Sequence, residues 1–214
     1  MLNRIMPNPR RSSLSSLASC LALGLACFFP LSAMAGTTSE TGLSRINHYP
    51  PHSYKGHSQV FQSVQGPDGV IYMTNYGAVF TWDGQRWGKI PVPGSGFLYG
   101  ISVLDEERFA VCGINTIGLI EPDGRGGWAF RSLAPDLPEA YQDALGEVWD
   151  MAATPEGLFF FTRRAMIRWK DGTAKVWPFE TEKMIYGFWS GSSIYVQNLD
   201  DGLYRLDGDN LVPL

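Results

Sequence analysis

Side chains able to do chemistry fall into two groups in this sequence. The first is a cluster of all three histidines, His48, His52 and His57, in one proline-rich stretch. Three imidazoles so close together could ligate a metal ion. No cysteine or carboxylate stands beside them at a recognised ligand spacing, so we expect a polar loop there, with no metal and no cofactor.

The second group occupies four successive turns of the chain. Its members are Asn75, Tyr76, Asn115, Arg163, Arg164, Asn198 and Asp200. One interpretation is structural, because asparagine tolerates left-handed turn positions. Arginine has no such preference, and a guanidinium pair suits a carboxylate or sulfate group. These residues are therefore candidates for a ligand-binding face, with the structural interpretation of the asparagines left open.

Catalytic residues are not predicted. The sequence shows no Ser-His-Asp, Cys-His or paired-carboxylate arrangement, and no histidine occurs after His57. A lyase or hydrolase requires an acid–base group at its site. Carboxylates such as Asp150 have the required chemistry, but their spacing does not distinguish them.

The elements that must position these residues repeat along the chain. The same Asp-Gly turn ends a strand-like run at Asp83-Gly84, Asp123-Gly124, Asp171-Gly172 and Asp207-Gly208. The glycines are 40, 48 and 36 residues apart, and periods of this length are typical of β-propellers and other repeat arrays.

Each repeat predicts four short strands. In the first repeat they are 60–65, 70–74, 78–82 and 86–90; in the third, 148–151, 158–161 and 166–169 are the first three. The runs are rich in β-branched and aromatic residues, and the breaks carry Gly, Asp or Asn. Four antiparallel strands make one propeller blade. We therefore predict an all-β fold, with one helical turn in the connection 138–145.

The first repeat resembles the two-component regulator propeller repeat. The resemblance rests on residues 59–72, on Asn75-x-Gly77 and on residues 80–87, and it extends over 57–214. Proteins of that family are bacterial sensors, with an exported propeller of about seven blades, a β-sandwich, a membrane helix and an intracellular output module. The resemblance implies blades at 57–96, 97–145, 146–184 and 185–214, in an array that looks truncated, with no output domain in this chain.

The first 35 residues predict a cleaved signal peptide. They contain Arg4, Arg10 and Arg11, an apolar stretch over 17–31 and the cleavage pattern Ala33-Met34-Ala35. Removing three of 17 basic and none of 21 acidic residues leaves a net charge of −7, which argues against nucleic-acid binding. Cys112 is then the last cysteine, and its apolar strand predicts a buried thiol.

Two further expectations concern packing. The seven tryptophans fall mostly at equivalent strand positions, which favours packing between blades over carbohydrate stacking. Residues 44–49 in the N-terminal segment 36–56 resemble fourth-strand runs and are predicted to close the ring as a strand of its last blade. Blades without neighbours would leave apolar faces that could self-associate.

The sequence therefore predicts a periplasmic ligand-sensing propeller, the input region of a bacterial signal-transduction receptor anchored in the inner membrane. Its ligand would be an unidentified small molecule or glycan. Two alternatives remain open: a propeller enzyme, such as a polysaccharide or ring-opening lyase, and an interaction scaffold or truncated remnant.

Overall fold

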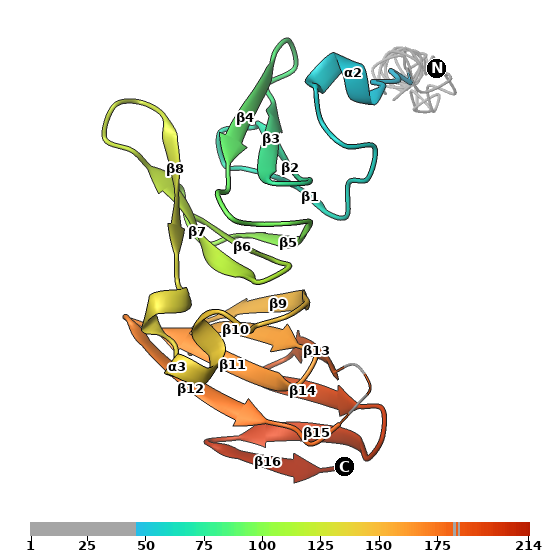
Figure 1. Ribbon diagram of the computed structural model, residues 1–214, viewed down its shortest axis with the longest axis vertical. Coiled ribbons are helices and arrows are strands. Elements are labelled where there is room, and N and C mark those ends of the chain that lie inside the picture. Colours follow the sequence, from blue (N-terminus) through green and yellow to red (C-terminus); the bar gives the residue numbers. More distant parts are fainter. Residues whose placement is uncertain (1–45, 182, 184) are drawn as a thin grey trace, which may run out of the picture. The chain divides into compact units, whose positions relative to one another are not determined.

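Among the residues that the structure describes, regularly spaced turns separate sixteen short strands (Figure 1). In this computed structural model, residues 46–181, 183 and 185–214 are described. The predicted signal peptide and its predicted cleavage site lie outside the described residues. So do residues 36–45, which include the first two residues of the predicted closing strand 44–49. Residues 47–214 form one compact unit by themselves.

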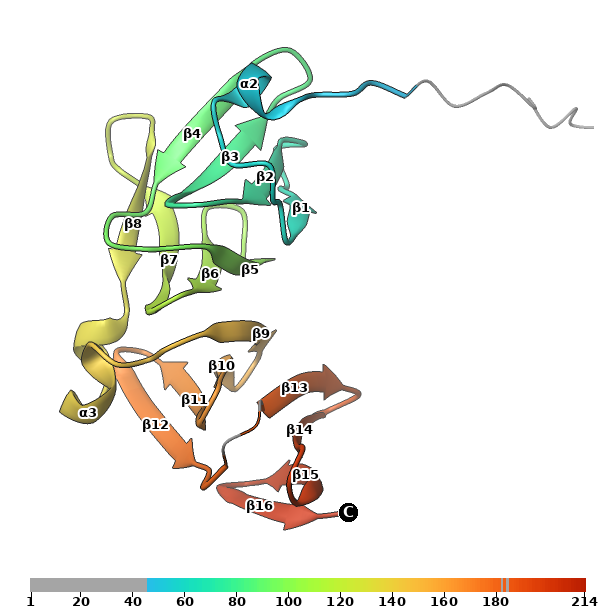
Figure 2. The same ribbon diagram turned by 45° about the vertical axis from the view of Figure 1, so that its right-hand side comes forward.

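The strands form four four-stranded antiparallel sheets, each made of consecutive strands in sequence order (Figure 2). The first sheet contains β1 (Ser63–Gln65), β2 (Ile71–Thr74), β3 (Ala78–Trp82) and β4 (Trp87–Pro91). The second contains β5 (Leu98–Val103), β6 (Phe109–Gly113), β7 (Thr116–Pro122) and β8 (Trp128–Ser132). The third contains β9 (Val148–Thr154), β10 (Gly157–Thr162), β11 (Ala165–Lys170) and β12 (Thr173–Pro178). The fourth contains β13 (Ile185–Ser190), β14 (Ser193–Asn198), β15 (Gly202–Asp207) and β16 (Asn210–Pro213).

The predicted all-β fold and its repeat are confirmed. Short helical segments occur at α2 (Pro51–Tyr54), η1 (Ala134–Asp136) and α3 (Glu139–Gln142), the last inside the connection that predicted a helical turn. Glycine is required at Gly157, where φ is 128° and a Cβ would lie 2.6 Å from the carbonyl oxygen of Trp169. No helix in the described part of the chain is long and apolar enough to cross a membrane.

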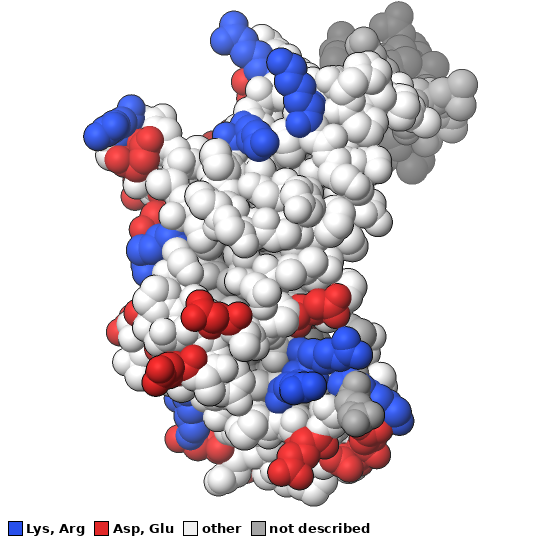
Figure 3. Space-filling model, in the orientation of Figure 1, with Lys and Arg blue, Asp and Glu red and all other residues white. Residues whose placement is uncertain are grey.

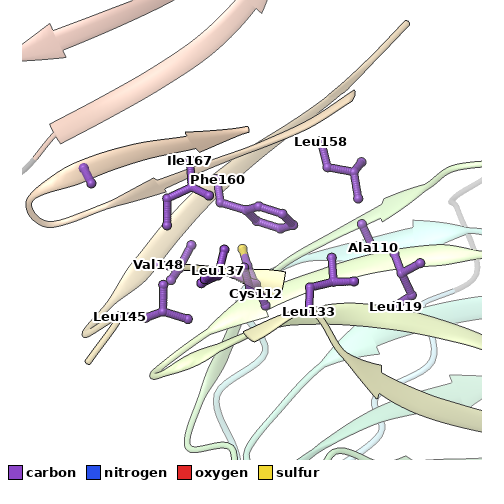
Figure 4. Close-up of a cluster of buried hydrophobic side chains, with 12 residues drawn as sticks. Ala110, Cys112, Leu119, Leu133, Leu137, Leu145, Val148, Leu158, Phe160 and Ile167 are labelled. Atoms are coloured by element: carbon purple, nitrogen blue, oxygen red, sulfur yellow. The ribbon is translucent and has the colours of Figure 1, made fainter. Parts of the chain in front are cut away.

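The hydrophobic core consists of three clusters, each between two consecutive sheets. Tyr72 and Val79 of the first sheet pack with Leu98, Ile101 and Phe109 of the second. In the next cluster, strands β6 and β7 meet β9, β10 and β11 around Cys112 and Phe160 (Figure 4). The last cluster joins the third and fourth sheets. Burial of this apolar surface is what attaches each sheet to its neighbours.

Strand β10 contributes its two faces to two different clusters. Leu158 and Phe160 pack in the cluster shared with the second sheet. Phe159 and Phe161, which alternate with them, pack against residues of the fourth sheet. Because successive side chains of a strand point to opposite sides, the central sheets are apolar on both faces.

A segment preceding β1 covers the remaining face of the first sheet. Tyr54 of α2 packs edge-on against Phe80, and Tyr49 contacts Trp82 and Trp87, with ring centroids 4.9–5.4 Å apart. We refer to residues 49–57 as the N-terminal cap. Tyr49 and its described neighbours are not in a strand, so the ring-closing strand predicted at 44–49 stays a prediction.

Candidate ligand-binding site

The turns between the second and third strands lie beside the connections that enter the next sheet. Tyr76 forms an isolated bridge with Phe97, and Ile114 forms one with Glu147. These pairs place the turn of one sheet next to the first strand of the following sheet. The turns of the first two sheets therefore lie beside the connections that enter the second and third sheets.

Asn75 is buried and uses its side chain inside the protein. Its Oδ1 accepts a hydrogen bond from the backbone N–H of His57 at 2.8 Å. Its Nδ2 donates to the carbonyl oxygens of His57 and Gln59, both at 2.9 Å. Since both donors are used and the residue is 1% exposed, Asn75 holds the N-terminal cap and is poorly placed to bind a ligand.

The other two asparagines also shape the chain around them. Asn115 is exposed, has a φ of 47° and accepts a hydrogen bond from the N–H of Gly146 at 2.7 Å. Asn198 is buried, donates to Asp201 and accepts from the N–H of Asp200. The left-handed conformation that asparagine tolerates thus occurs at Asn115, whereas Asn75 and Asn198 are held by hydrogen bonds.

The remaining predicted residues carry their side chains toward solvent. Tyr76 is 57% exposed and packs edge-on against Phe97. Arg163 lies 3.9 Å from Glu147, and no carboxylate among the described residues forms an ion pair with Arg164. Asp200 pairs with Lys183 at 2.7 Å and accepts a hydrogen bond from Thr181. Tyr76, Arg163 and Arg164 are the candidates most accessible to a ligand.

An aromatic row that the sequence analysis did not single out lies along the first strands. It consists of Phe61, which lies just before β1, of Tyr99 in β5 and of Trp149 in β9. Tyr99 and Trp149 are stacked, with ring centroids 4.1 Å apart and planes 6° apart. Phe61, which is 42% exposed, meets Tyr99 edge-on at 4.8 Å. The three rings form a chain of contacts in which Tyr99 is 8% exposed and Phe61 and Trp149 are more exposed.

Two β-bulges produce the stacked pair. The register between β5 and β6 shifts from Leu98↔Gly113 to Gly100↔Cys112, so Tyr99 is the extra residue. The register between β9 and β10 shifts from Phe161↔Asp150 to Thr162↔Val148, so Trp149 is the extra residue there. A bulge turns a side chain out of the regular alternation and often does so beside a functional site.

Charged groups border the aromatic row. Glu147 accepts a hydrogen bond from the indole Nε1 of Trp149 at 3.3 Å, and the guanidinium of Arg163 lies 3.9 Å from the same carboxylate oxygen. Partial burial, with the charge of Glu147, raises the pKa of Tyr99. Partial burial also raises the pKa of Asp150, although a hydrogen bond from the N–H of Met151 opposes the shift.

Two cavities lie elsewhere in the fold. One of about 470 Å³ is lined by Leu104, Arg108, Leu119, Trp169 and Lys170, among others. Another of about 370 Å³ is lined by the turn 154–156, Trp189 and the turn 191–193. None of the seven predicted site residues lines either cavity. Both include turns between first and second strands, opposite to the turns that carry the predicted residues.

The histidine cluster and the tryptophans are also placed. The ring of His57 packs edge-on against Phe97 at 4.9 Å, and no group of metal-ligating side chains is present among the described residues. Trp128, Trp169 and Trp177 pack in or against the core clusters, as predicted. Trp189 is instead 44% exposed.

On the face seen in Figure 3, charges of both signs occur in small groups around a broad uncharged area.

Comparison with known proteins identifies the architecture. No family model matches the chain, and no curated protein matches it. Among solved structures, it is similar to the extracellular domain of BT4673 from B. thetaiotaomicron, described as a hybrid two component system, with 19% identity and a TM-score of 0.53. The WD40 β-propeller domain of Doa1 gives 14% identity and a TM-score of 0.50, with coverage of 73% of this chain and 57% of that chain.

The fold is a β-propeller. Its four described sheets are blades, and the aromatic row lies in or just before the first strands of the first three. The match to the BT4673 domain covers 72% of this chain and 20% of the other, so the chain spans about a fifth of that protein's length. At such identities the similarity establishes the fold, and the activity needs a separate argument.

Proposed function

We propose that this propeller is the ligand-sensing input region of a bacterial signalling receptor, and that its ligand binds across the aromatic row. The observation that carries the proposal is the contact of Phe61, Tyr99 and Trp149 across three blades, bordered by Glu147 and Arg163. The resemblance of the repeats to sensor propellers, and the similarity to the extracellular domain of a two component system, support the sensing role.

The chemistry of this surface suits a ring-bearing small molecule or a glycan. Apolar ring faces stack on Phe61 and Trp149. Arg163 and Arg164 supply guanidinium groups for a carboxylate or sulfate. Glu147 accepts hydrogen bonds from hydroxyl or amine groups. The surface therefore combines apolar contact with a few charged groups that fix orientation, as small-molecule sites commonly do.

Sensing by this surface requires export. We propose that the signal peptide is cleaved after Ala35 and that the propeller faces the periplasm, as part of a receptor anchored in the inner membrane. N-terminal sequencing of the exported protein should begin at Gly36. Recovery of the protein in the cytoplasm with an intact N-terminus would contradict this location.

Binding is tested with the purified exported protein and a panel of glycan fragments and small carboxylates, using intrinsic tryptophan fluorescence and thermal shift. A ligand that binds should lose at least about ten-fold in affinity on Trp149→Ala, which removes stacking worth on the order of 1.5 kcal/mol. Arg163→Ala should weaken acidic ligands selectively.

Matched controls are Trp189→Ala, an exposed tryptophan away from the aromatic row, and Arg125→Ala, in the turn between β7 and β8. A ligand whose affinity depends on Trp189 and not on Trp149 would place the site in the cavity between the third and fourth blades. That result would refute the proposed surface.

A propeller enzyme is the second candidate, and one observation favours it. The pKa of Asp150 is raised by partial burial, and a carboxyl that stays protonated nearer to neutral pH can act as a general acid. Asp150→Asn would then abolish turnover while leaving ligand affinity intact. Unchanged turnover of a ligand by this variant would exclude Asp150 as its acid.

A further inference from the structure

A cavity of about 370 Å³ lies between the third and fourth blades. One wall is the turn between β9 and β10, with Pro155 and Glu156. The other wall comes from the fourth blade, at the turns between β13 and β14 and between β15 and β16. The same two blades pack on each other through a shared core cluster. The walls of the cavity are therefore formed entirely by residues that the structure describes.

Trp189 presents an exposed indole to this cavity. It is paired with Ile194 in the ladder between β13 and β14, so the two side chains lie on the same face of the blade. Ile194 and Leu206 belong to the core cluster shared with the third blade, so this face is turned toward that blade. Trp189 is nevertheless 44% exposed. An indole that faces the neighbouring blade without being covered by it is available for a ligand to stack on.

The charged groups that line the cavity are carboxylates. Glu156 and Asp207 line it and are exposed, and none of the described lysines and arginines does so. Neither carboxylate forms an ion pair with a described residue. In contrast, Asp209 in the turn after β15 is paired with Lys175 and Arg168. At neutral pH the cavity therefore places two uncompensated negative charges beside an aromatic ring.

The cavity between the second and third blades differs in charge. It shares Pro155 with the first, but its charged lining consists of Arg108, Lys170 and Asp171. The ammonium group of Lys170 lies 3.4 Å from the carbonyl oxygen of Pro155. The excess of negative charge is thus a property of the gap that contains Trp189, and does not follow from the propeller architecture.

We propose that the cavity between the third and fourth blades binds a small organic cation, an amine or a quaternary ammonium compound. The ammonium group lies against the face of Trp189, where the ring quadrupole attracts it. Glu156 and Asp207 supply the opposite charge, and the hydroxyl group of Ser193 is available to a polar substituent. A volume of about 370 Å³ is within the range of small-molecule sites. The site is separate from the aromatic row, so this inference is independent of the proposed sensing ligand.

Titration calorimetry of the purified protein with choline tests the site. The control ligand is the neutral analogue of choline in which a quaternary carbon replaces the nitrogen. Choline should bind saturably and at least about five-fold more tightly than this alcohol, because the cation alone gains from the indole face and the carboxylates. Trp189→Ala should weaken choline binding at least about five-fold. Trp149→Ala, in the aromatic row, should leave it unchanged.

The carboxylates are tested together, because each is exposed and contributes little alone. Glu156→Gln combined with Asp207→Asn should weaken choline binding at least about five-fold. The melting temperature should stay unchanged, because both side chains are exposed. Glu106→Gln is the matched control, since Glu106 is exposed in the corresponding turn of the second blade and lines neither cavity.

Three results would each overturn the proposal. The first is the absence of saturable choline binding, and the second is equal affinity for choline and its neutral analogue. The third is choline binding that survives Trp189→Ala or depends on Trp149. The glycans and carboxylates proposed for the aromatic row should be indifferent to Trp189, so failure of either site leaves the other open to its own test.

Discussion

Replacing Asn75 with alanine should destabilise the protein well beyond the usual effect of losing a turn residue. The substitution removes three hydrogen bonds of 2.8–2.9 Å that join the first blade to His57 and Gln59. Each is worth about 1 kcal/mol net, and stranded buried groups cost more. The free energy of unfolding should fall by about 2–4 kcal/mol.

The assay is urea denaturation followed by tryptophan fluorescence. Trp82 and Trp87 lie beneath Tyr49 and Tyr54, so release of the N-terminal cap also exposes them to a soluble quencher before global unfolding. Asn115→Ala is the control, because Asn115 is exposed and its side chain accepts one hydrogen bond; it should cost about 0.5–1.5 kcal/mol.

Asn75→Asp distinguishes hydrogen bonding from packing. The carboxylate has the same shape, but it faces the carbonyl oxygens of His57 and Gln59 without a proton to donate. It should destabilise the protein at neutral pH at least as strongly as alanine does, and less in acid. A loss below about 0.5 kcal/mol for both substitutions, the range of ordinary surface changes, would refute the role assigned to Asn75.

Two other predictions concern buried or partly buried groups. Asp150→Asn should raise the melting temperature at pH 7, because the raised pKa of Asp150 makes its ionisation unfavourable in the folded protein. The gain should vanish below the ordinary aspartate pKa of about 4, where the carboxyl is protonated in both the folded and the unfolded protein. Equal gains in melting temperature at pH 7 and pH 3 would contradict this cause. Cys112 should resist alkylation in the native protein, because it is fully buried and burial raises the pKa of its thiol; its modification rate should follow urea unfolding, whereas rapid labelling without denaturant would show that β6 opens locally.

Much of the fold could be predicted because turns and strands are local. Asp83-Gly84 and its three counterparts mark hairpins through residues that accept positive φ, and β3 has the bounds predicted from its flanking turns. The bulges at Tyr99 and Trp149 could not be predicted, because register depends on the partner strand. Comparing first strands across repeats would have shown an aromatic residue recurring there.

The candidate site was harder to predict because residue type does not reveal burial. Asn75, Asn115 and Asn198 occupy corresponding turns and look alike in sequence, yet two of them are buried and one is exposed. Whether an asparagine binds a ligand or its own backbone depends on what the neighbouring blade places beside it. Arg163 and Arg164, which have no turn preference, remain the more informative signal.

The two-sided packing of β10 has a consequence for how the sequence can change. Phe160 shares a cluster with Cys112 and Leu119, whereas its neighbour Phe161 shares one with Ile185 and Val196. Residues adjacent in this strand should therefore vary independently of each other, whereas each should covary with the residues of the blade that it contacts. Among homologues, alternate positions of this strand should track opposite blades, and exchanging one blade would require compensation at every second residue of the strand.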